Sequence, residues 1–431
     1  MNIPFTNVPR VVIIGGGFAG VALARKMIKE NVQLVVLDRH NYHTFQPLLY
    51  QVSTSSLEAD SIAYPLRKIV KKGKNTFFRM AEVSSITPNE KKVHTNIGTI
   101  SYDYLIIATG AKTNFFGNKT IEANAMRMKN LPQALNLRSL ILENLEQAVI
   151  TENIKERKKY LSFVLAGAGP TGVELAGGIA ELKLNVLPRD YPDMDFGDME
   201  IHLIEGADRV LPPMSEKASK EATKFLNKLG VQIHLNTIVS GYENNVVSTN
   251  TSLELETTTF IWSAGVTGAP IEGIDGASLI PRANRYKVNR VNQIEGFTDV
   301  YAIGDIALME TEAFPKGHPM VAQPAIQQGK HLAENLIRHT KGKEMLPFTY
   351  FDKGSMATIG RNKAVVDIGK FKFAGFFAWF VWMFIHLWFL IGFRNRFITL
   401  FNWSYNYTNY DKAARLIVRS YKNREDTVER V

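Results

Sequence analysis

Two glycine-rich turns in this sequence have the spacing that can hold a dinucleotide. The first is a G-x-G-x-x-G turn formed by Gly15, Gly17 and Gly20. In such a turn the first glycine permits a tight bend, the second lets the backbone approach a pyrophosphate, and the third lets the next helix pack against the strand. Free N–H groups and the positive end of the helix dipole favour phosphate there. A turn that binds no ligand is the alternative.

The elements around this turn are those that dinucleotide binding requires. The β-branched run Val11–Ile14 predicts a buried parallel strand, and residues 19–30 have the apolar spacing of a helix. A second strand over residues 33–37 ends at Asp38, whose carboxylate can accept hydrogen bonds from ribose hydroxyls. The strand, turn, helix, second strand and acidic residue therefore follow in the expected order.

The same unit occurs again further along the chain. A strand over residues 161–166 precedes the second turn, and a strand over residues 201–204 ends at Glu205. The glycines of this turn are Gly167, Gly169 and Gly172. The acidic residues Asp38 and Glu205 favour nucleotides with a free 2′-hydroxyl, since they would repel a 2′-phosphate, although Arg209 weakens that preference. Two dinucleotides suggest FAD with NAD, and hydride transfer from nicotinamide to flavin.

Three further segments could complete a flavin site. One buried strand ends in the small residues Ala108, Thr109 and Gly110, which let a cofactor lie against the backbone. Another ends in Gly304-Asp305, where Asp305 could bind a ribityl chain; an ordinary strand end is the alternative. Gln323 and Gln327 share one face of a predicted helix and could bond a carbonyl ring without adding charge. Plain surface amides are the alternative for these two glutamines.

Composition excludes some classes of protein and favours others. A length of 431 residues predicts two or three domains, and the absence of cysteine excludes every thiol mechanism, including those of disulfide and sulfide reductases. The net charge is +10, and nine Lys/Arg against four Asp/Glu fall in the last 61 residues. Because that tail is also the most aromatic part of the chain, the charge favours a membrane surface and not nucleic acid.

The tail contains an apolar run, residues 371–393, that is long enough for a membrane-spanning helix. Basic residues flank both ends, and its tryptophans lie in the middle instead of at the two interfaces. We therefore favour a helix lying in one leaflet, followed by an amphipathic segment over residues 415–419. A core or dimer-interface helix is the alternative. His386 reads as a satisfied or interfacial histidine and not as a metal ligand, and we predict no metal site.

The sequence resembles those of the type II, non-proton-pumping NADH:quinone oxidoreductases. The resemblance covers nearly the whole sequence and is most specific in three segments, residues 43–51, 322–327 and 352–361. It implies an α/β fold with two Rossmann-like domains and a C-terminal membrane-anchoring helical segment. The expected domains are an FAD-binding domain formed by residues 1–116 and 297–345, an NADH-binding domain formed by residues 117–296, and a quinone-site and membrane-anchoring region, residues 346–431.

The resemblance also assigns site residues. We expect FAD contacts from Gly15, Gly17, Phe18, Ala19, Gly20, Asp38, Arg39, Gln46, Ala108, Thr109, Gly110, Gly304, Asp305 and Gln323. We expect NADH contacts from Gly167, Gly169, Thr171, Gly172, Glu205 and Gly265. Gln323 and Gln327 are implied as quinone-site residues, and Glu174 or Lys353 could supply a proton route. For Glu174 the alternative is a favourable charge at a helix N-terminus; for Lys353 it is a carboxylate partner or a solvated lysine.

The expected activity is FAD-dependent oxidation of NADH with two-electron reduction of a membrane quinone, menaquinone or ubiquinone, without proton pumping. The expected partners are NADH, the quinone, the lipid bilayer surface and a second copy in a homodimer, with no nucleic acid. The expected location is peripheral, on the cytoplasmic face of the cell membrane. A related flavoprotein reductase with another acceptor, and a membrane-bound FAD/NADH redox sensor, are the alternatives.

Overall fold

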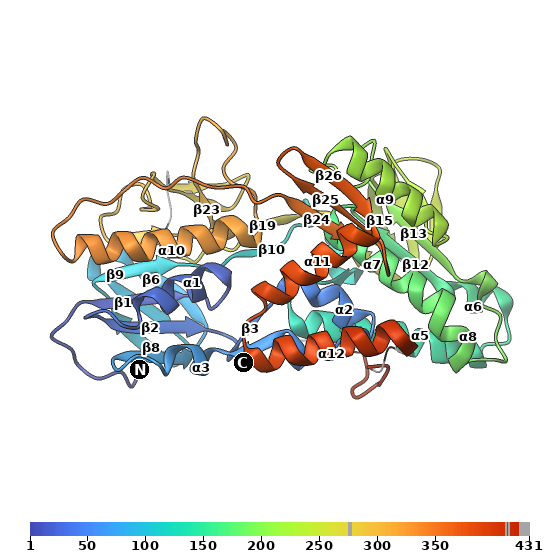
Figure 1. Cartoon of the computed structure of the whole chain (residues 1–431), viewed down its shortest axis with the longest axis horizontal. Helices are drawn as coiled ribbons and strands as arrows, with labels where there is room; N and C mark the ends of the chain where they lie inside the picture. Colours follow the sequence, from blue (N-terminus) through green and yellow to red (C-terminus); the bar gives the residue numbers. More distant parts are fainter. Residues whose placement is uncertain (275–277, 410–411, 413, 422–431) are drawn as a thin grey trace.

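The computed structural model describes residues 1–274, 278–409, 412 and 414–421. Two α/β modules lie side by side along the long axis, and a smaller C-terminal module lies in front of the junction between them (Figure 1). This arrangement confirms the predicted fold class of two Rossmann-like units with C-terminal helices.

The first module is built on a five-stranded parallel sheet. Its strands, in spatial order, are β22 (Val300–Ala302), β9 (Tyr104–Ile107), β1 (Arg10–Ile14), β2 (Gln33–Asp38) and β5 (Thr76–Met80). Helices α1 (Phe18–Met27) and α10 (Ala322–His339) cover one face side by side. Val11 and Ile13 point to these helices, and Val12 and Ile14 to the opposite core. The strand is therefore buried on both faces, as its uninterrupted apolar sequence predicts.

The other face of this sheet is covered by a small antiparallel sheet. Its strands are β6 (Val83–Thr87), β7 (Lys92–Thr95) and β8 (Gly98–Ser101). Their inward residues Ile86, Val93 and Ile100 join the core that contains Val12 and Ile14.

The second module repeats this plan. Its parallel strands, in spatial order, are β11 (Met126–Arg127), β18 (Thr259–Trp262), β12 (Ser162–Ala166), β13 (Glu200–Ile204) and β14 (Gln232–His234). The helices whose side chains share its main core are α5 (Leu131–Ile150), α7 (Pro170–Glu181) and α9 (Glu216–Lys228). The opposite face packs against the meander β15 (Val239–Glu243), β16 (Val246–Thr249) and β17 (Glu254–Glu256).

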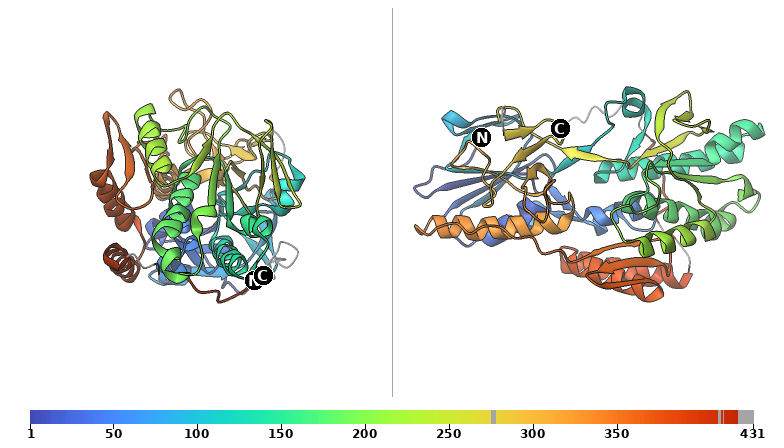
Figure 2. Two further views of the ribbon diagram at one scale, coloured as in Figure 1. Left: turned by 90° about the vertical axis from the view of Figure 1, so that its right-hand side faces the viewer. Right: turned by 90° about the horizontal axis from the view of Figure 1, so that it is seen from above.

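The C-terminal module consists of an antiparallel sheet and two helices. They are β24 (Ser355–Thr358), β25 (Ala364–Ile368), β26 (Phe371–Gly375), α11 (Phe376–Phe389) and α12 (Phe393–Asn409). In the view from above, these helices lie along one long side of the molecule (Figure 2). The side chain of Asn395 on α12 donates hydrogen bonds to the carbonyls of Asp60, Ser61 and Ala63, which ties this module to the first.

Shorter elements complete the described chain. The helices are α2 (Leu49–Ser53), α3 (Leu66–Val70), α4 (Lys119–Asn124), α6 (Ile154–Leu161) and α8 (Leu187–Asp190), with a π-helical turn at Leu182–Val186. The strands are β3 (Tyr42–Thr44), β4 (Ala63–Pro65), β10 (Ala111–Thr113), β19 (Val266–Gly268), β20 (Leu279–Ile280), β21 (Arg285–Lys287) and β23 (Ala307–Leu308).

The structure corrects the prediction for the tail. Residues 371–375 form β26 and not the start of a helix, and Gly375, with φ of +94°, separates that strand from α11. A second break at Gly392, with φ of +95°, separates α11 from α12. The predicted amphipathic segment over residues 415–419 is not helical. Within the described residues, every helix is too short or too polar to cross a bilayer.

Candidate active site

The first glycine-rich turn joins β1 to α1 and has the shape that a pyrophosphate requires. Gly15 has φ of +111°, and a Cβ on Gly20 would lie 1.9 Å from the carbonyl oxygen of Gly15. A Cβ on Gly17 would meet no atom within 4 Å. The first and third glycines are therefore required by the protein itself, whereas the second faces open space that a phosphate can occupy.

The second turn has the same geometry between β12 and α7. Gly167 has φ of +98°, and a Cβ on Gly172 would lie 1.9 Å from the carbonyl oxygen of Gly167. A Cβ on Gly169 would again meet nothing within 4 Å. Thr171 is exposed at the start of α7, and Gly265 follows β18 in a segment that contacts this turn.

The two acidic residues have matching partners. Asp38 accepts hydrogen bonds from the N–H of Gly16 at 2.5 Å and from the residue two positions after itself at 2.7 Å. Glu205 accepts from the N–H of Ala168 at 2.7 Å and from the residue two positions after itself at 3.0 Å. Burial raises the pKa of Asp38, and the N–H groups of His40 and Gly16 oppose that rise. Each carboxylate is fixed beside its turn and keeps lone pairs for ribose hydroxyls.

A cavity of about 1370 Å³ extends along the first module from the first turn to the start of α10. This volume exceeds the roughly 300–1,000 Å³ of ordinary small-molecule sites, as an extended dinucleotide requires. The predicted FAD contacts that line it are Gly15, Gly17, Phe18, Ala19, Asp38, Arg39, Gln46, Ala108, Thr109, Gly110, Gly304 and Asp305. Of the other two predicted FAD contacts, Gly20 lies buried behind the turn and Gln323 does not line this cavity; the second turn also lies outside it. The residues present fit FAD.

The Gly304-Asp305 turn is held by two side chains that sequence reasoning missed. Gly304, with φ of +75°, donates its N–H to the side-chain oxygen of the buried Gln328 at 2.7 Å. Nζ of Lys129 lies 4.0 Å from the carboxylate of Asp305. Burial raises the pKa of Asp305, whereas the charges of Lys129 and Arg285 oppose that rise. The sequence feature that could have identified Gln328 is its position, next to Gln327, on the apolar face of the predicted helix.

The structure brings Gln323, Gln327 and Lys353 together. The hydrogen bonds that join them run from the glutamine side chains to main-chain groups of residues 351–354. The amide of Gln323 donates to the carbonyl of Gly354 at 2.8 Å and accepts from the N–H of Lys353 at 3.1 Å. The amide of Gln327 donates to the carbonyl of Phe351 at 2.8 Å and accepts from its N–H at 3.0 Å. The two side chains thus hold residues 351–354 along α10 in the manner of a neighbouring β-strand. Nζ of Lys353 lies 5.7 Å from the ring centre of Phe389.

Glu174 lies inside the protein, one turn along α7 from the second glycine turn. Its side chain accepts a hydrogen bond from the N–H of Thr358 at 3.4 Å. Burial raises the pKa of Glu174 to about 8, although Thr358 and the indole of Trp382 oppose the rise. The phenol of Tyr50 also faces this group, and the charge of Glu174 contributes to a raised pKa of Tyr50. Glu174 is therefore mainly protonated at neutral pH and can hold or release a proton.

Replacing Glu174 with glutamine is expected to make stability less dependent on pH. The folded-state pKa of about 8 lies above the ordinary value of 4.5, so the folded protein keeps a proton that the unfolded chain releases between these values. Wild-type stability must therefore fall as pH rises through this window. Because glutamine is neutral at every pH, the stability of Glu174→Gln does not have this pH dependence. As pH rises through the window, the free energy of unfolding of the variant should therefore increase relative to that of wild type, by at most about 1.4 kcal/mol per unit of pKa shift.

Urea unfolding of both proteins at about pH 5 and about pH 8 measures this difference. A stability difference that is the same at the two pH values would show that Glu174 is not buried with a raised pKa.

His386 on α11 agrees with its prediction as a satisfied histidine. Its Nδ1 lies 2.7 Å from the carbonyl oxygen of Trp382, and the two rings stack with their centres 4.1 Å apart. Burial lowers the pKa of His386 to about 4, so the ring is neutral at physiological pH. Its ring packs α11 against Phe45, with the two ring centres 6.2 Å apart.

Comparisons with known proteins agree with this geometry. Residues 9–329 match the pyridine nucleotide-disulphide oxidoreductase family, and residues 353–408 match the NDH2 C-terminal domain. The chain is 39% identical over 412 residues to the type II NADH:quinone oxidoreductase Ndh of Mycobacterium tuberculosis, covering 92% of this chain and 87% of that one. It is 29% identical over 365 residues to the type II NADH:quinone oxidoreductase of Staphylococcus haemolyticus, covering 83% and 89%.

Among solved structures, NDH2 of Plasmodium falciparum in complex with NADH has the same fold. The TM-score is 0.87 at 21% identity, and the match covers 96% of this chain and all of that one. The sulfide:quinone oxidoreductase of Aquifex aeolicus matches with a TM-score of 0.70 at 19% identity, covering 90% and 92%. The absence of cysteine from this sequence removes the thiol chemistry that the name of the larger family describes.

Proposed function

This chain belongs to the type II NADH:quinone oxidoreductase family, and we propose how its residues divide the work of that activity. The protein oxidises NADH and reduces a quinone, with FAD as its cofactor. When bound, FAD accepts a hydride from NADH and passes two electrons to the quinone. The observation that carries the assignment of residues is the repeated turn, in which Asp38 and Glu205 have the same backbone partners.

The first module supplies the FAD site. The large cavity supports this proposal because it joins the first turn, the carboxylate of Asp38 and the carboxylate of Asp305. Gly17 leaves room for the pyrophosphate, Asp38 accepts from the adenosine ribose, and Asp305 accepts from the ribityl chain. We assign residues 1–116 and 297–345 to this domain, since β22 completes the sheet that β1 begins.

We assign the NADH site to the second module and to residues 117–296, although Ile271, Tyr286 and Ile294 of this range pack in the core of the first module. Glu205 accepts from a free ribose and disfavours the 2′-phosphate of NADPH. Arg209, which could have weakened this preference, donates to the carbonyl of Pro212 at 3.0 Å. The supporting feature is again the open space at Gly169, where a second pyrophosphate can approach the start of α7.

The quinone side of the site is formed where α10 meets residues 351–354. Gln323 and Gln327 hold this segment against α10, and the start of the same helix lines the cavity through Ala322 and Ala325. Glu174 and Lys353 are the groups that can supply protons as the quinone is reduced. We propose that the glutamines shape the quinone site by positioning this segment.

Gln327→Glu tests this role. The carboxylate cannot donate to the carbonyl of Phe351, and a lost hydrogen bond of this kind corresponds to about a 5–10-fold change. We expect KM for the quinone to rise by that factor while NADH still reduces the flavin at the wild-type rate. Lys330→Ala, at an exposed position on the same helix, is the matched control. Slower flavin reduction with an unchanged quinone KM would place Gln327 on the NADH side instead.

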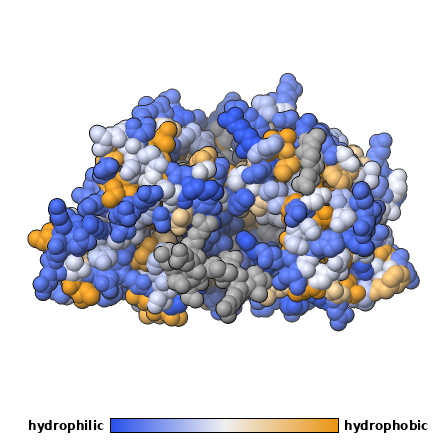
Figure 3. Space-filling view, turned by 180° about the vertical axis from the view of Figure 1, so that it is seen from behind, coloured by the Kyte–Doolittle hydropathy of each residue, from blue (hydrophilic) through white to orange (hydrophobic). Residues whose placement is uncertain are grey.

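The C-terminal helices supply a membrane-docking face. Their exposed apolar side chains are Phe376, Phe377, Phe380, Phe384, Trp388, Phe389, Phe393, Phe397, Leu400, Phe401 and Tyr405. Exposed Lys370 and Lys372 lie at the start of β26, which leads into α11, and exposed Arg394 lies at the start of α12. All three can meet anionic lipid. The opposite face of the molecule is largely hydrophilic, with scattered apolar residues (Figure 3). We propose peripheral attachment through α11 and α12, on the cytoplasmic face, by a homodimer.

Negative charge introduced on the exposed face of α11 and α12 should release the protein from membranes. We expect a Phe380→Asp, Phe384→Asp and Phe401→Asp triple variant to stay folded, because all three side chains are more than half exposed, and to lose sedimentation with anionic vesicles. Aspartate at Ile150 and Ile154, exposed positions on the second module, should leave vesicle binding intact. Unchanged sedimentation of the triple variant would contradict docking through these helices.

A further inference from the structure

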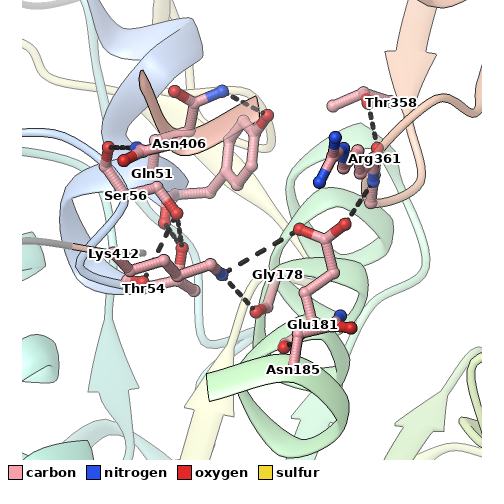
Figure 4. A network of polar contacts seen from close by, with 12 residues as sticks. Gln51, Thr54, Ser56, Gly178, Glu181, Asn185, Thr358, Arg361, Asn406 and Lys412 are labelled. Atoms are coloured by element: carbon pink, nitrogen blue, oxygen red, sulfur yellow. Dashed lines mark hydrogen bonds and ion pairs between the residues drawn. The ribbon is translucent and has the colours of Figure 1, made fainter. Parts of the chain in front are cut away.

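A second cavity lies beneath α11 and α12, apart from the FAD cavity. Its volume is about 120 Å³, and its walls come from α2, α7, α11, α12 and the turn after β24 (Figure 4). The aromatic part of the wall consists of Tyr50, Trp379, Trp382, Trp403 and Tyr407. The space is thus mostly apolar, and it lies at the junction of all three modules.

Lys412 places an ammonium group in this cavity. The residue is 8% exposed, and its Nζ donates to the carbonyl of Gly178 at 3.0 Å. Its Nζ also forms an ion pair with the carboxylate of Glu181 at 4.0 Å, drawn as a dashed line in Figure 4. An ammonium group has three donors, so two of them have no acceptor among the residues that the structure describes. Burial lowers the pKa of Lys412 to about 8, and the charge of Glu181 opposes this.

The charges around the cavity favour an anion. One oxygen of Glu181 already accepts from the main-chain N–H of Arg361. The guanidinium carbon of Arg361 lies 3.9 Å from the ring centre of Tyr407, at the edge of the cavity. The guanidinium of Arg361 adds a second positive charge at this edge of the cavity. A buried cation with unused donors, such as Lys412, is stabilised by an anionic acceptor.

The wall is irregular on the α7 side. The regular helix ends at Glu181, and the π-helical turn Leu182–Val186 carries Asn185 and Val186 into the lining. A Cβ on Gly178 would approach the side chain of Thr54 to 3.0 Å, so α2 lies close to the carbonyl that binds Lys412. Helical turns of this kind are frequent at ligand sites.

We propose that this cavity binds the carboxylate of a long-chain fatty acid. The carboxylate accepts from Lys412, and the first methylenes lie between the aromatic rings of α11 and α12. A volume of about 120 Å³ holds about four water-sized groups, which suits a carboxylate with a few methylenes. The outer faces of the same two helices carry exposed phenylalanines, which can cover the rest of the chain. The lining of this cavity shares no residue with the lining of the FAD cavity.

Quenching of tryptophan fluorescence by 9,10-dibromostearate tests the proposal on the full-length, FAD-loaded enzyme. Trp379, Trp382 and Trp403 line the cavity, so bromine atoms near them should quench their emission in a saturable way. The methyl ester has the same chain without the charge, and inorganic phosphate has charge without a chain. We expect saturation with the acid alone, and about 10-fold or greater weakening in Lys412→Met. Lys412→Arg and the exposed-lysine control Lys155→Met, on the second module, should bind like wild type.

Any of three results would overturn the proposal. If the methyl ester saturates as tightly as the acid, or if Lys412→Met binds as well as wild type, the fatty acid only partitions onto α11 and α12. If inorganic phosphate blocks the acid at equal concentration, the site takes a free anion. The measurements with the methyl ester and with inorganic phosphate use the wild-type protein, so they test the proposal even if Lys412→Met fails to fold. NADH:quinone turnover in the same samples separates this site from the proposed function, since loss of turnover alone leaves the binding result standing.

Discussion

Replacing Gly20 with alanine is expected to destabilise the folded protein, whereas the same change at Gly17 should reduce FAD affinity and leave stability unchanged. The Cβ of Gly20→Ala would lie 1.9 Å from the carbonyl oxygen of Gly15, so the helix must move away from the strand. Overpacking of this kind destabilises by about 1–3 kcal/mol. The Cβ of Gly17→Ala meets no protein atom within 4 Å, and it occupies the space that the pyrophosphate needs.

The two variants are each other's control. Thermal unfolding of the FAD-depleted proteins reports the first effect, and titration with FAD reports the second. We expect Gly20→Ala to unfold at a lower temperature than wild type. Gly17→Ala should unfold like wild type but bind FAD about 10-fold or more weakly, a loss that corresponds to about 1.4 kcal/mol. If both variants lose stability equally, the turn is a structural feature and not a phosphate site.

Asp38→Asn and Glu205→Gln should each weaken the binding of a different nucleotide. Glu205→Gln removes the charge that accepts from the NADH ribose, and hydrogen bonds to charged groups contribute about 1.5–3 kcal/mol. We expect KM for NADH to rise about 10- to 100-fold with little change in kcat, because the ribose contact is the same in the ground state and the transition state. Asp38→Asn should lower the FAD content and leave KM for NADH unchanged in the FAD-loaded fraction.

Steady-state kinetics normalised to bound flavin measure both effects in one series. Glu205→Gln should also narrow the difference between NADH and NADPH, since the repulsion of a 2′-phosphate is removed. A Glu205→Gln protein that loses FAD, or an Asp38→Asn protein with a raised KM for NADH, would reverse the assignment of the two modules.

The parts of the fold that the sequence predicted are those that depend on neighbours in the chain. The two turns, their flanking strands and the acidic residues at the next strand ends lie within short segments, and the structure has each where it was expected. The prediction that the apolar run of the tail is helical from residue 371 was wrong. An apolar run predicts burial or membrane contact, but it does not show that Phe371 and Phe373 pair with β25 before the helix begins.

The site residues that were missed depend on contacts between distant segments. Gln328 is a polar residue on an apolar helix face, and only the structure places it against Gly304. Lys129 and Asp305 are far apart in the chain, and their proximity follows from the packing of the two modules. The amides of Gln323 and Gln327 were expected to face a quinone, yet their partners lie in residues 351–354, which no helical spacing could identify.

Stopped-flow absorbance of the purified protein at the flavin band tests the central claim most directly. The protein is mixed first with NADH and then with a quinone, and the series is repeated with NADPH. We expect NADH to bleach the band rapidly, the quinone to restore it at a rate that matches turnover, and NADPH to act far more weakly. A protein without a flavin band, or a band that NADH does not bleach, would contradict the assignment of the two glycine-rich turns to FAD and NADH.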